Sequence, residues 1–250
     1  MTEARTASSE QARALDAAAE AHGVPAQMLM AVASFQCASL ARTLLLDLGG
    51  PRSRAAVMVG KGNNGGDALG CARHLSSWGF AVRCLTVQPV ELMGGASAAQ
   101  ALAAEHSGVE LQSIGTTSTE LDAATTAVLD EADLVVDGLL GSGSRGAPRG
   151  DLAALVLRVN RSSAPVLAID LPSGLDPDTG QVEGDCVRAD HTVMLGIAKA
   201  GCESASARHW VGQLWLADIG IPAAAYRDCG LRLPGELGPV PRSYQASPPS

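Results

Sequence analysis

The sequence predicts an α/β protein with a doubly wound, mainly parallel sheet, and three observations support that fold class. From Arg54 onward, short and almost continuously apolar runs alternate with stretches of helical pattern. Strands that are apolar on both faces are typical of parallel sheets covered by helices, and the alternation of strand and helix produces right-handed crossovers. Three of the predicted strands lead directly into polar, glycine-rich loops, and such sheets bind their ligands at the carboxyl ends of strands.

Two helices are predicted before the first strand. The stretch EQARALDAAAEAHG has a helical pattern that ends at Gly23, a residue suited to a helix C-terminus. Pro25 suits the start of a second helix, AQMLMAVASFQCASLARTLLLDLGG. The part from Met28 to Leu46 is almost continuously apolar. We therefore expect it to be buried, either against the sheet or at a two-fold interface with a second copy.

The remaining elements follow the order of a doubly wound fold. The predicted strands are AAVMVG (55–60), AVRCLTV (81–87), VELQSI (109–114), DLVVDGLLG (133–141), PVLAIDLPSG (165–174), HTVMLG (191–196) and GQLWLADIG (212–220). The predicted helices between them are GDALGCARHLSSWG (66–79), SAAQALAAEHSG (97–108), TELDAATTAVLDEA (119–132) and DLAALVLRVNRS (151–162). We divide the chain into a flexible N-terminus (1–10), one domain (11–232) and a tail rich in Pro, Gly and Ser (233–250) with the composition of a disordered segment.

Composition and charge narrow the class of function. The net charge of −8, the pI of about 5.1 and the aromatic content of 3% argue against nucleic-acid binding, which needs basic surfaces and stacking platforms. The six cysteines include no Cys-x-x-Cys pair and no zinc-like spacing, so we interpret them as buried thiols in a reducing cytoplasm. The N-terminus lacks the pattern of a secretory signal, and no run of 18 apolar residues predicts a membrane span.

The first of the three loops is GKGNNGGD (60–67), which follows the first predicted strand and opens a helix. Its glycines permit positive φ angles and close backbone approach, and the amide groups at the start of the helix favour an anion. The spacing matches neither the dinucleotide fingerprint G-x-G-x-x-G nor the P-loop pattern G-x-x-x-x-G-K-[ST]. We therefore expect a loop that cradles phosphate by the same physics without following either motif.

The second loop is VVDGLLGSGSRGAPRG (135–150). Asp137 stands at the end of its strand, and four glycines then make a loop that carries Arg145 and Arg149. Two arginines in such a loop suit a phosphate or pyrophosphate group. The alternative for the arginines alone is a solvated surface loop, and the neighbouring Asp137 and glycines argue against it.

The third loop is AIDLPSGLDPDTG (168–180). Asp170 ends an apolar strand, so its carboxylate is expected to be partly desolvated. Pro172 and Gly174 bend the chain and direct Ser173 back toward the sheet edge. Carboxylate, hydroxyl and carbonyl oxygens at one edge can hold a hard cation. The alternative for Asp170 is a carboxylate that only braces its loop.

Together these loops resemble the NAD(P)H-hydrate epimerase family, of the YjeF N-terminal domain type. The stretches that carry the resemblance are GKGNNGGDALGCARHL, DLVVDGLLGSGSRGAPRG and VLAIDLPSGLDPDTGQVEGDCVRADHTVMLGIAKAG, in this order. The resemblance covers residues 10 to 222. It implies a Rossmann-like, three-layer α/β/α sandwich that forms a homodimer and interconverts the R and S forms of hydrated NADH and NADPH, so the dinucleotide is a substrate and not a redox cofactor.

The resemblance also implies roles for particular residues. The implied substrate contacts are Asn63, Asn64, Gly65, Gly66, Asp67, Gly141, Ser142, Gly143, Ser144, Arg145, Gly146, Ala147 and Asp170. The implied ligands of a potassium ion are Asn64, Asp137 and Ser173. Epimerisation requires a hydroxyl group to leave the hydrated ring and return on the other face. A carboxyl group that donates and then accepts a proton would serve this chemistry, and Asp170 is our candidate.

The sequence departs from the family in two places, and these departures leave alternatives open. The segment LMAVAS has Ala31 and Val32 where the family commonly has glutamate and asparagine near the pocket or the dimer-facing wall, and Ala198 replaces a usual proline. One alternative is therefore a reused scaffold, an isomerase or cyclase acting on a less polar molecule in a specialised biosynthetic pathway. A second alternative is a non-catalytic nucleotide-binding or scaffold module, against which Asp170, Asp137 and the first loop argue.

Overall fold

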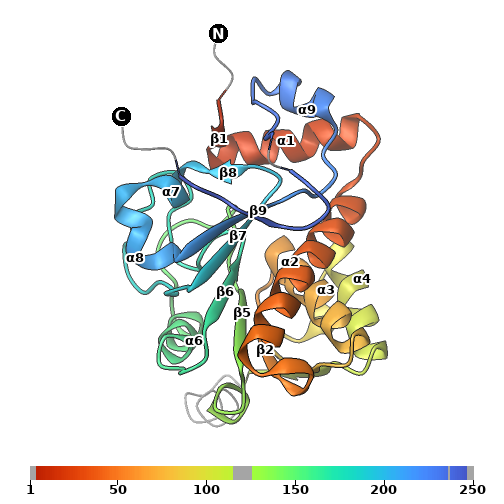
Figure 1. Cartoon of the computed structure of the whole chain (residues 1–250), viewed down its shortest axis with the longest axis vertical. Coiled ribbons are helices and arrows are strands. Elements are labelled where there is room, and N and C mark those ends of the chain that lie inside the picture. The colour runs from red at the N-terminus through yellow and green to blue at the C-terminus, as the bar shows by residue number, and fades with distance from the viewer. Residues whose placement is uncertain (1–3, 115–125, 236, 247–250) are drawn as a thin grey trace.

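The computed structural model in Figure 1 describes residues 4–114, 126–235 and 237–246. Its centre is an eight-stranded sheet in the order β10-β9-β7-β6-β5-β2-β3-β4, in which every neighbouring pair is parallel except β10 and β9. The strands are β2 (Arg54–Val59), β3 (Ala81–Thr86), β4 (Glu110–Ser113), β5 (Leu134–Gly138), β6 (Val166–Ile169), β7 (His191–Leu195), β9 (Gln213–Ala217) and β10 (Arg242–Ser243). The predicted doubly wound, mainly parallel sheet is confirmed.

Helices cover both faces of this sheet and make three layers (Figure 1). One face carries α2 (Ala26–Leu48), α3 (Asn63–Ser77) and α4 (Gly95–His106), and the other carries α6 (Asp151–Val159). The smaller elements are β1 (Thr6–Ala7), α1 (Ser9–Ala21), η1 (Gly50–Arg52), η2 (Val90–Leu92), β8 (Ala198–Lys199), α7 (Ala200–Glu203), η3 (Ala205–Ala207), α8 (Arg208–Val211) and α9 (Ala223–Asp228). Of the predicted helix 119–132, residues 126–129 are helical and 119–125 lie outside the described residues.

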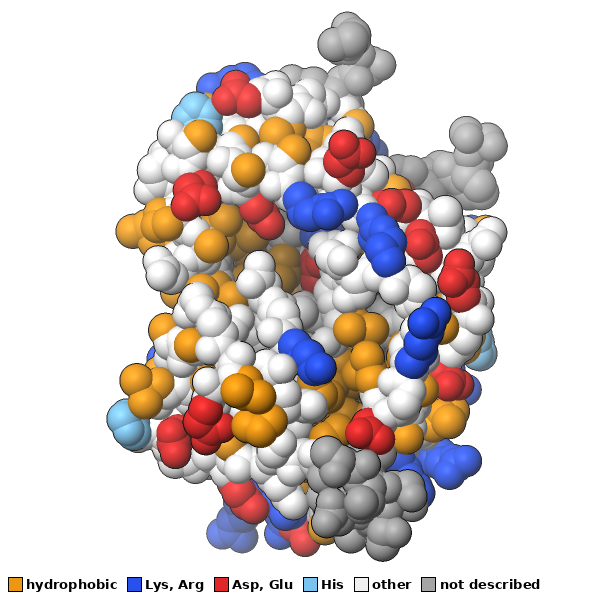
Figure 2. Space-filling model, turned by 180° about the vertical axis from the view of Figure 1, so that it is seen from behind, with side chains coloured by type: hydrophobic (Ala, Val, Ile, Leu, Met, Phe, Trp, Pro, Cys, Tyr) orange, Lys and Arg blue, Asp and Glu red, His pale blue; other side chains and the backbone are white. Residues whose placement is uncertain are grey.

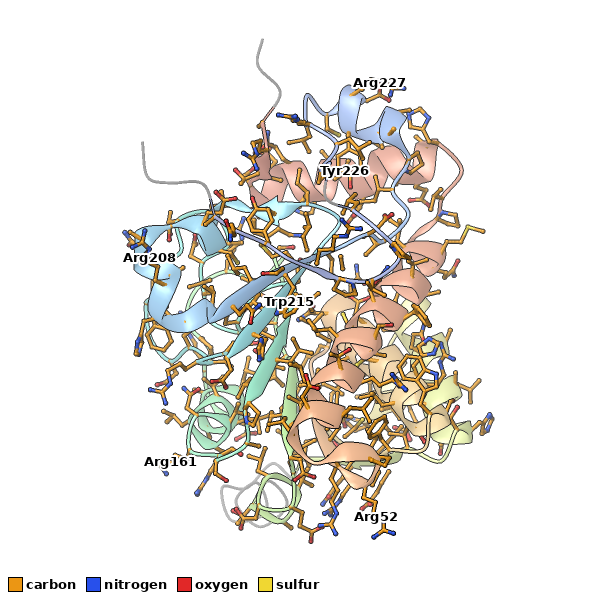
Figure 3. The ribbon with its side chains drawn as sticks, in the orientation of Figure 1. Arg52, Arg161, Arg208, Trp215, Tyr226 and Arg227 are labelled. Carbon is orange, nitrogen blue, oxygen red and sulfur yellow. The ribbon has the colours of Figure 1, made fainter. Side chains whose placement is uncertain are left out.

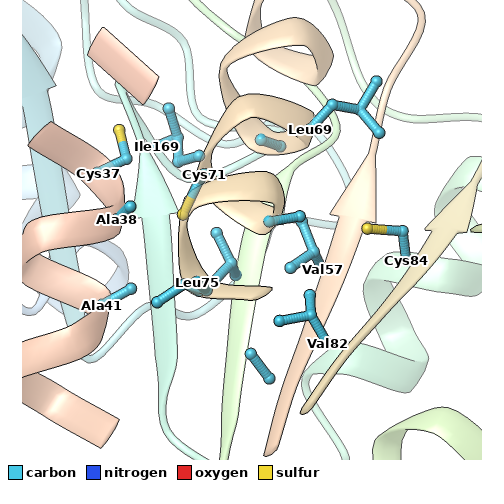
Figure 4. Packing of buried hydrophobic residues seen from close by; sticks show 14 of the residues in the cluster. Cys37, Ala38, Ala41, Val57, Leu69, Cys71, Leu75, Val82, Cys84 and Ile169 are labelled. Atoms are coloured by element: carbon cyan, nitrogen blue, oxygen red, sulfur yellow. The ribbon is translucent and has the colours of Figure 1, made fainter. Parts of the chain in front are cut away.

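The side chains of β2 show why the central strands are apolar throughout. Ala55, Val57 and Val59 belong to the core shared with α2, α3 and α4, part of which Figure 4 shows. Ala56 and Met58 point to the other face and belong to the core that includes α6. Because successive residues of a strand face opposite sides, a strand covered by helices on both faces needs apolar residues at every position.

Both ends of the chain are more structured than the composition predicts. The sequence predicts a flexible segment over 1–10, whereas Thr6–Ala7 pair with β8 and α1 begins at Ser9 behind a capping box formed by Ser8 and Gln11. The segment 233–250 is predicted to be disordered or loosely attached, and within it Arg242–Ser243 extend the sheet beside β9. Pairing with an edge strand and helix capping supply order that composition alone does not indicate.

The long apolar helix α2 is buried on one face and exposed on the other. Leu29, Ala33 and Cys37 are buried, whereas Val32 is 38% exposed and Phe35 is 42% exposed. The prediction of a buried helix therefore holds for its inner face only. By length and composition α2 could cross a membrane, but 56% of its most apolar window is buried inside the molecule, as in a core helix.

Candidate active site

The three polar loops meet in a pocket of about 1220 Å³ at the carboxyl edge of the sheet. Its walls come from α1, the first half of α2, the start of α3 and the loops that follow β2, β5, β6, β7 and β9. Figure 2 shows the hollow on the face opposite to Figure 1, with hydrophobic side chains in its depth and Lys and Arg side chains beside it. The predicted convergence of the loops is what the structure shows.

The start of α3 presents backbone donors at one end of this pocket. The first hydrogen bond of the helix runs from Gly66 N–H to Gly62 O over 3.2 Å. The N–H groups of Asn63, Asn64 and Gly65 precede it and have no acceptor within the helix. Since Asn63 and Asn64 line the pocket, this wall offers N–H groups and the positive end of the helix dipole to an anion.

The glycines of the loop 60–66 serve close packing. None of them has a positive φ angle, so the loop uses the close backbone approach that glycine permits and not its freedom in φ. A Cβ atom on Gly65 would lie 2.0 Å from Gly60 O, which leaves no room for any other residue between α3 and β2. Of the implied substrate contacts at 63–67, Gly65 and Gly66 lie outside the pocket lining and the other three belong to it.

The glycine loop after β5 lines the pocket from Gly141 to Ala147, as the resemblance implies. Its Arg145 is already engaged: the guanidinium donates to Ser144 O over 3.0 Å, to Asp178 Oδ2 over 3.3 Å and to Ser9 Oγ. These contacts tie the loop to the start of α1. The guanidinium of Arg145 therefore holds the wall of the pocket together in this structure.

Two other cations in loops of the pocket lining have no such partners. Lys61 and Arg149 form no ion pair with any described residue. Both are exposed, and both stand in loops that carry backbone donors or glycines. Lys61 and Arg149 are therefore the cations of these loops that remain available to an anionic ligand.

The three implied potassium ligands lie in one buried, hydrogen-bonded cluster. Ser173 donates its hydroxyl to Asp137 Oδ1 over 2.7 Å and its N–H to Asp137 Oδ2 over 2.8 Å. The Asn64 amide donates to Leu140 O over 2.8 Å and to Ile169 O over 3.1 Å. Leu140 N–H in turn donates to Ser173 Oγ over 2.9 Å. The cluster joins the start of α3 to the ends of β5 and β6.

Asp137 is fully buried in this cluster. Burial raises the pKa of its carboxyl above the ordinary value, while hydrogen bonds from Ser173 and from Leu139 N–H act in the opposite direction. No described cationic side chain forms an ion pair with it. A buried carboxylate among hydroxyl, amide and carbonyl oxygens suits a hard cation, which would supply the missing positive charge.

Asp170 lies at the centre of the pocket wall, and its burial confirms the expected desolvation: the residue is 7% exposed. Its φ of 67° is the one positive φ angle of a non-glycine residue in the described chain. The backbone N–H donates to Val193 O over 2.8 Å, and Oδ1 lies 2.7 Å from Lys199 Nζ. A strained backbone at a pocket carboxylate is typical of a functional site.

Two further carboxyl groups share this part of the pocket, Asp67 of α3 and Asp16 of α1. Burial raises the pKa of Asp67 well above its ordinary value, and the carboxylates of Asp170 and Asp16 add to the rise while Lys199 opposes it. Asp67 is therefore neutral under conditions in which an exposed aspartate is ionised. One ammonium and several carboxyl groups in one pocket provide both a proton donor and a proton acceptor.

Sequence reasoning missed one member of this pocket, Asp16, and did not predict the partner of another, Lys199. Asp16 lies on a helix that carried no recognised motif, and only the fold brings it to Asp170. Lys199 lies in the stretch GIAKAG that carries the resemblance, and a lone lysine in an apolar stretch is a signal for a buried partner. Asp16 and Asp170 both reach Lys199 from elements distant in sequence, so this grouping is a tertiary property.

The fold and this pocket define a Rossmann-like α/β protein with a ligand site at the carboxyl edge of its sheet. Residues 26–201 match the family described as YjeF-related protein N-terminus. The chain belongs to this family. Helix α1, which supplies Asp16, lies outside the matched residues.

Curated relatives agree with the family match. The chain is 37% identical over 177 residues to the NAD(P)H-hydrate epimerase of Rhodopirellula baltica, covering 71% of this chain and 70% of that protein. It is 38% identical over 175 residues to the NAD(P)H-hydrate epimerase of Pirellula staleyi, covering 70% and 76%. Among solved structures, the yeast protein ynu0 has a TM-score of 0.80 over 96% of this chain and 99% of its own, at 21% identity. That likeness shows the fold alone.

The close packing of Gly65 predicts a sharp difference between two neighbouring glycines. Gly65→Ala places a Cβ against the backbone oxygen of Gly60 and should lower the free energy of unfolding by about 1–3 kcal/mol. Gly62→Ala is the control, because nothing lies within 4 Å of its added Cβ. Urea unfolding of both variants measures the difference, and equal stabilities would contradict the packing role.

The buried carboxyl of Asp67 predicts a dependence of stability on pH. Above its ordinary pKa of 3.8, the unfolded chain releases this proton while the folded chain keeps it. The free energy of unfolding therefore falls as the pH rises, by about 1.4 kcal/mol for each unit over which only the unfolded chain is ionised. Asp67→Asn removes this effect.

Urea unfolding of wild type and Asp67→Asn across the pH range measures it. The variant should gain stability relative to the wild type as the pH rises above the ordinary pKa of 3.8. A difference between the two proteins that stays constant with pH would show that Asp67 is not a buried acid in the folded chain.

Proposed function

We propose that this protein interconverts the R and S epimers of hydrated NADH and NADPH in cofactor repair. The observation that carries the proposal is the pocket itself, in which the implied contacts Asn63, Asn64, Asp67 and Asp170 line one hollow with the loop 141–147. The family match and the names of the relatives support the same reaction. The six free cysteines and the ordinary α/β fold fit a cytoplasmic protein.

The lining of the pocket suits the two parts of such a substrate. The N–H groups at the start of α3 and the cations of Lys61 and Arg149 suit phosphate groups. The lining also includes carboxyl groups and apolar side chains such as Leu29 and Ile219, which suit a hydrated nicotinamide ring. The dinucleotide is thus bound as a substrate.

The reaction needs a proton at the departing hydroxyl and an acceptor for the proton of the returning water. Asp170 is the proposed acid and base, since its Oδ2 is free of hydrogen bonds from described residues while Oδ1 is held by Lys199. Neutral Asp67 can supply a proton in the same pocket. The ring nitrogen stabilises the iminium-like species, and the apolar walls limit its exposure to bulk water.

The Asn64, Asp137 and Ser173 cluster is the proposed holder of a potassium ion. The fit rests on its oxygen-rich composition and on the buried Asp137, which has no cationic partner among the described residues. Rotation of the Asn64 amide would present its oxygen, in place of its nitrogen, to the same surroundings. When bound, the ion supplies positive charge that fixes the loops of the pocket.

The exposed departures from the family pattern weaken the case for a less polar substrate. Ala31 and Val32 are exposed on the outer face of α2 and do not line the pocket. Their apolar character therefore leaves the pocket lining unchanged, and of the two places considered for these positions the outer, dimer-facing wall is the one that fits. The same outer face supports the proposal of a homodimer, because Met28, Val32 and Phe35 form an apolar stripe at helical spacing.

Replacing Asp170 and Asp137 should separate catalysis from ion binding. Asp170→Asn keeps the shape and removes the titratable proton, so turnover of an isolated epimer should fall on the order of 10²–10⁴-fold while binding is better preserved. Asp137→Asn should weaken the affinity for potassium and recover part of its activity when potassium is raised.

Incubation with one purified epimer of hydrated NADH, followed by chromatography, provides the measurement. Near-full activity of Asp170→Asn would show that Asp170 only stabilises its loop. Wild-type protein that leaves both epimers of hydrated NADH and of hydrated NADPH untouched would contradict the proposed function itself.

The dimer proposal predicts different results when two large apolar residues that are equally exposed are each replaced by glutamate. Phe35 on α2 and Leu157 on α6 are each 42% exposed. Phe35→Glu should convert the protein from dimer to monomer, whereas Leu157→Glu on the opposite layer should leave the dimer intact. Sedimentation at micromolar concentration measures this, and a monomeric wild type would remove the proposal.

A further inference from the structure

Lys199 is a buried residue of the pocket lining, and its ammonium group makes all of its hydrogen bonds within the protein. The residue is 4% exposed. Its Nζ donates to Leu195 O over 2.8 Å, to Ile197 O over 3.0 Å and to Asp170 Oδ1 over 2.7 Å. Because an ammonium has three hydrogens, no donor remains for a ligand.

These contacts join two loops that are separate in sequence. Asp170 follows β6, whereas Leu195 ends β7, Lys199 ends β8 and residues 196–197 connect these two strands. The Asp170 carboxylate receives a further, longer contact of 3.4 Å from Leu195 N–H on the same Oδ1. One oxygen of the carboxylate is therefore anchored to the loop after β7, while Oδ2 has no hydrogen bond from a described residue.

The backbone of Asp170 makes such an anchor necessary. Its φ of 67° lies in the left-handed region, which non-glycine residues adopt only when their surroundings impose it. A short side chain in this conformation points where the backbone directs it, and the ammonium fixes the remaining rotation.

We propose that Lys199 is the positioning residue of this site, acting only through Asp170: it holds Oδ1 so that Oδ2 faces the substrate. This inference rests on the proposed function, in which Asp170 moves the proton. It also explains why a lysine at the pocket is closed to solvent while Lys61, the one other lysine of the chain, is exposed.

A rival explanation is that Lys199 merely braces its own loop. The structure offers a matched control, since Tyr226 (labelled in Figure 3) braces the same loop by donating its hydroxyl to Gly196 O over 2.8 Å. Tyr226 is buried and does not contact Asp170 through any hydrogen bond described for it. Tyr226→Phe therefore removes a hydrogen bond that stabilises the loop and leaves the Asp170 carboxylate bound to Lys199.

The test is a double-mutant cycle on the epimerisation of hydrated NADH. Lys199→Met should lower kcat by about 10²-fold with little change in KM, because a catalytic group displaced by about 1 Å loses that much. In the Asp170→Asn background, Lys199→Met should cause no further loss. Lys199→Arg should recover part of the rate, and Tyr226→Phe should keep a kcat close to that of the wild type.

Two outcomes would overturn the proposal. One is an equal loss from Lys199→Met in the presence and absence of the Asp170 carboxylate, which would mean that the lysine acts elsewhere. The other is a loss of kcat in Tyr226→Phe as large as that in Lys199→Met, which would assign the effect to the loop.

A second measurement covers the case in which Lys199→Met does not fold or the wild type does not turn over hydrated NADH. The chain has two lysines, so NMR with lysine labelled at Cε gives two signals, of which exposed Lys61 is the internal control. Asp170→Asn should move the Lys199 signal and speed the exchange of its ammonium hydrogens, and should leave Lys61 unchanged. An unmoved Lys199 signal would contradict the proposed anchor. An inactive wild type with a shifted Lys199 signal would contradict the proposed function alone.

Discussion

The buried carboxylate of Asp137 is the interaction on which the pocket depends. It accepts hydrogen bonds from the hydroxyl and the N–H of Ser173, and through Leu140 the same network reaches Asn64 at the start of α3. A buried charge is costly unless it is fully hydrogen-bonded, so each loop is stabilised where it best satisfies this carboxylate. For that reason, the network fixes the relative positions of the ends of β5 and β6 and the start of α3.

Close backbone packing makes this network possible. The glycine at position 65 lets α3 begin directly against the loop after β2, where any side chain would collide with Gly60 O. The N–H groups of the first helical turn then remain without an acceptor in the helix, beside the lining residues Asn63 and Asn64. The same loop thus provides a site for anions and a fixed distance between helix and sheet.

Charge is divided within the pocket in a way that matches a dinucleotide. The outer loops contribute Lys61, Arg149 and backbone donors, although the chain as a whole carries a net charge of −8. The inner end collects Asp16, Asp67 and Asp170 around the one ammonium of Lys199. Like charges at close range favour keeping a proton on one of the carboxyl groups, and this is the condition that proton transfer requires.

The sequence by itself determined the fold class, because apolar strands alternating with helices have few arrangements other than a covered parallel sheet. It also determined which strand ends carry the chemistry, since Asp137 and Asp170 each end an apolar run. Only the tertiary structure decided that Arg145 braces the wall and that Lys199 holds Asp170. Those pairings join residues 33 and 29 positions apart, and side-chain contacts over such separations depend on how elements pack and leave no local pattern.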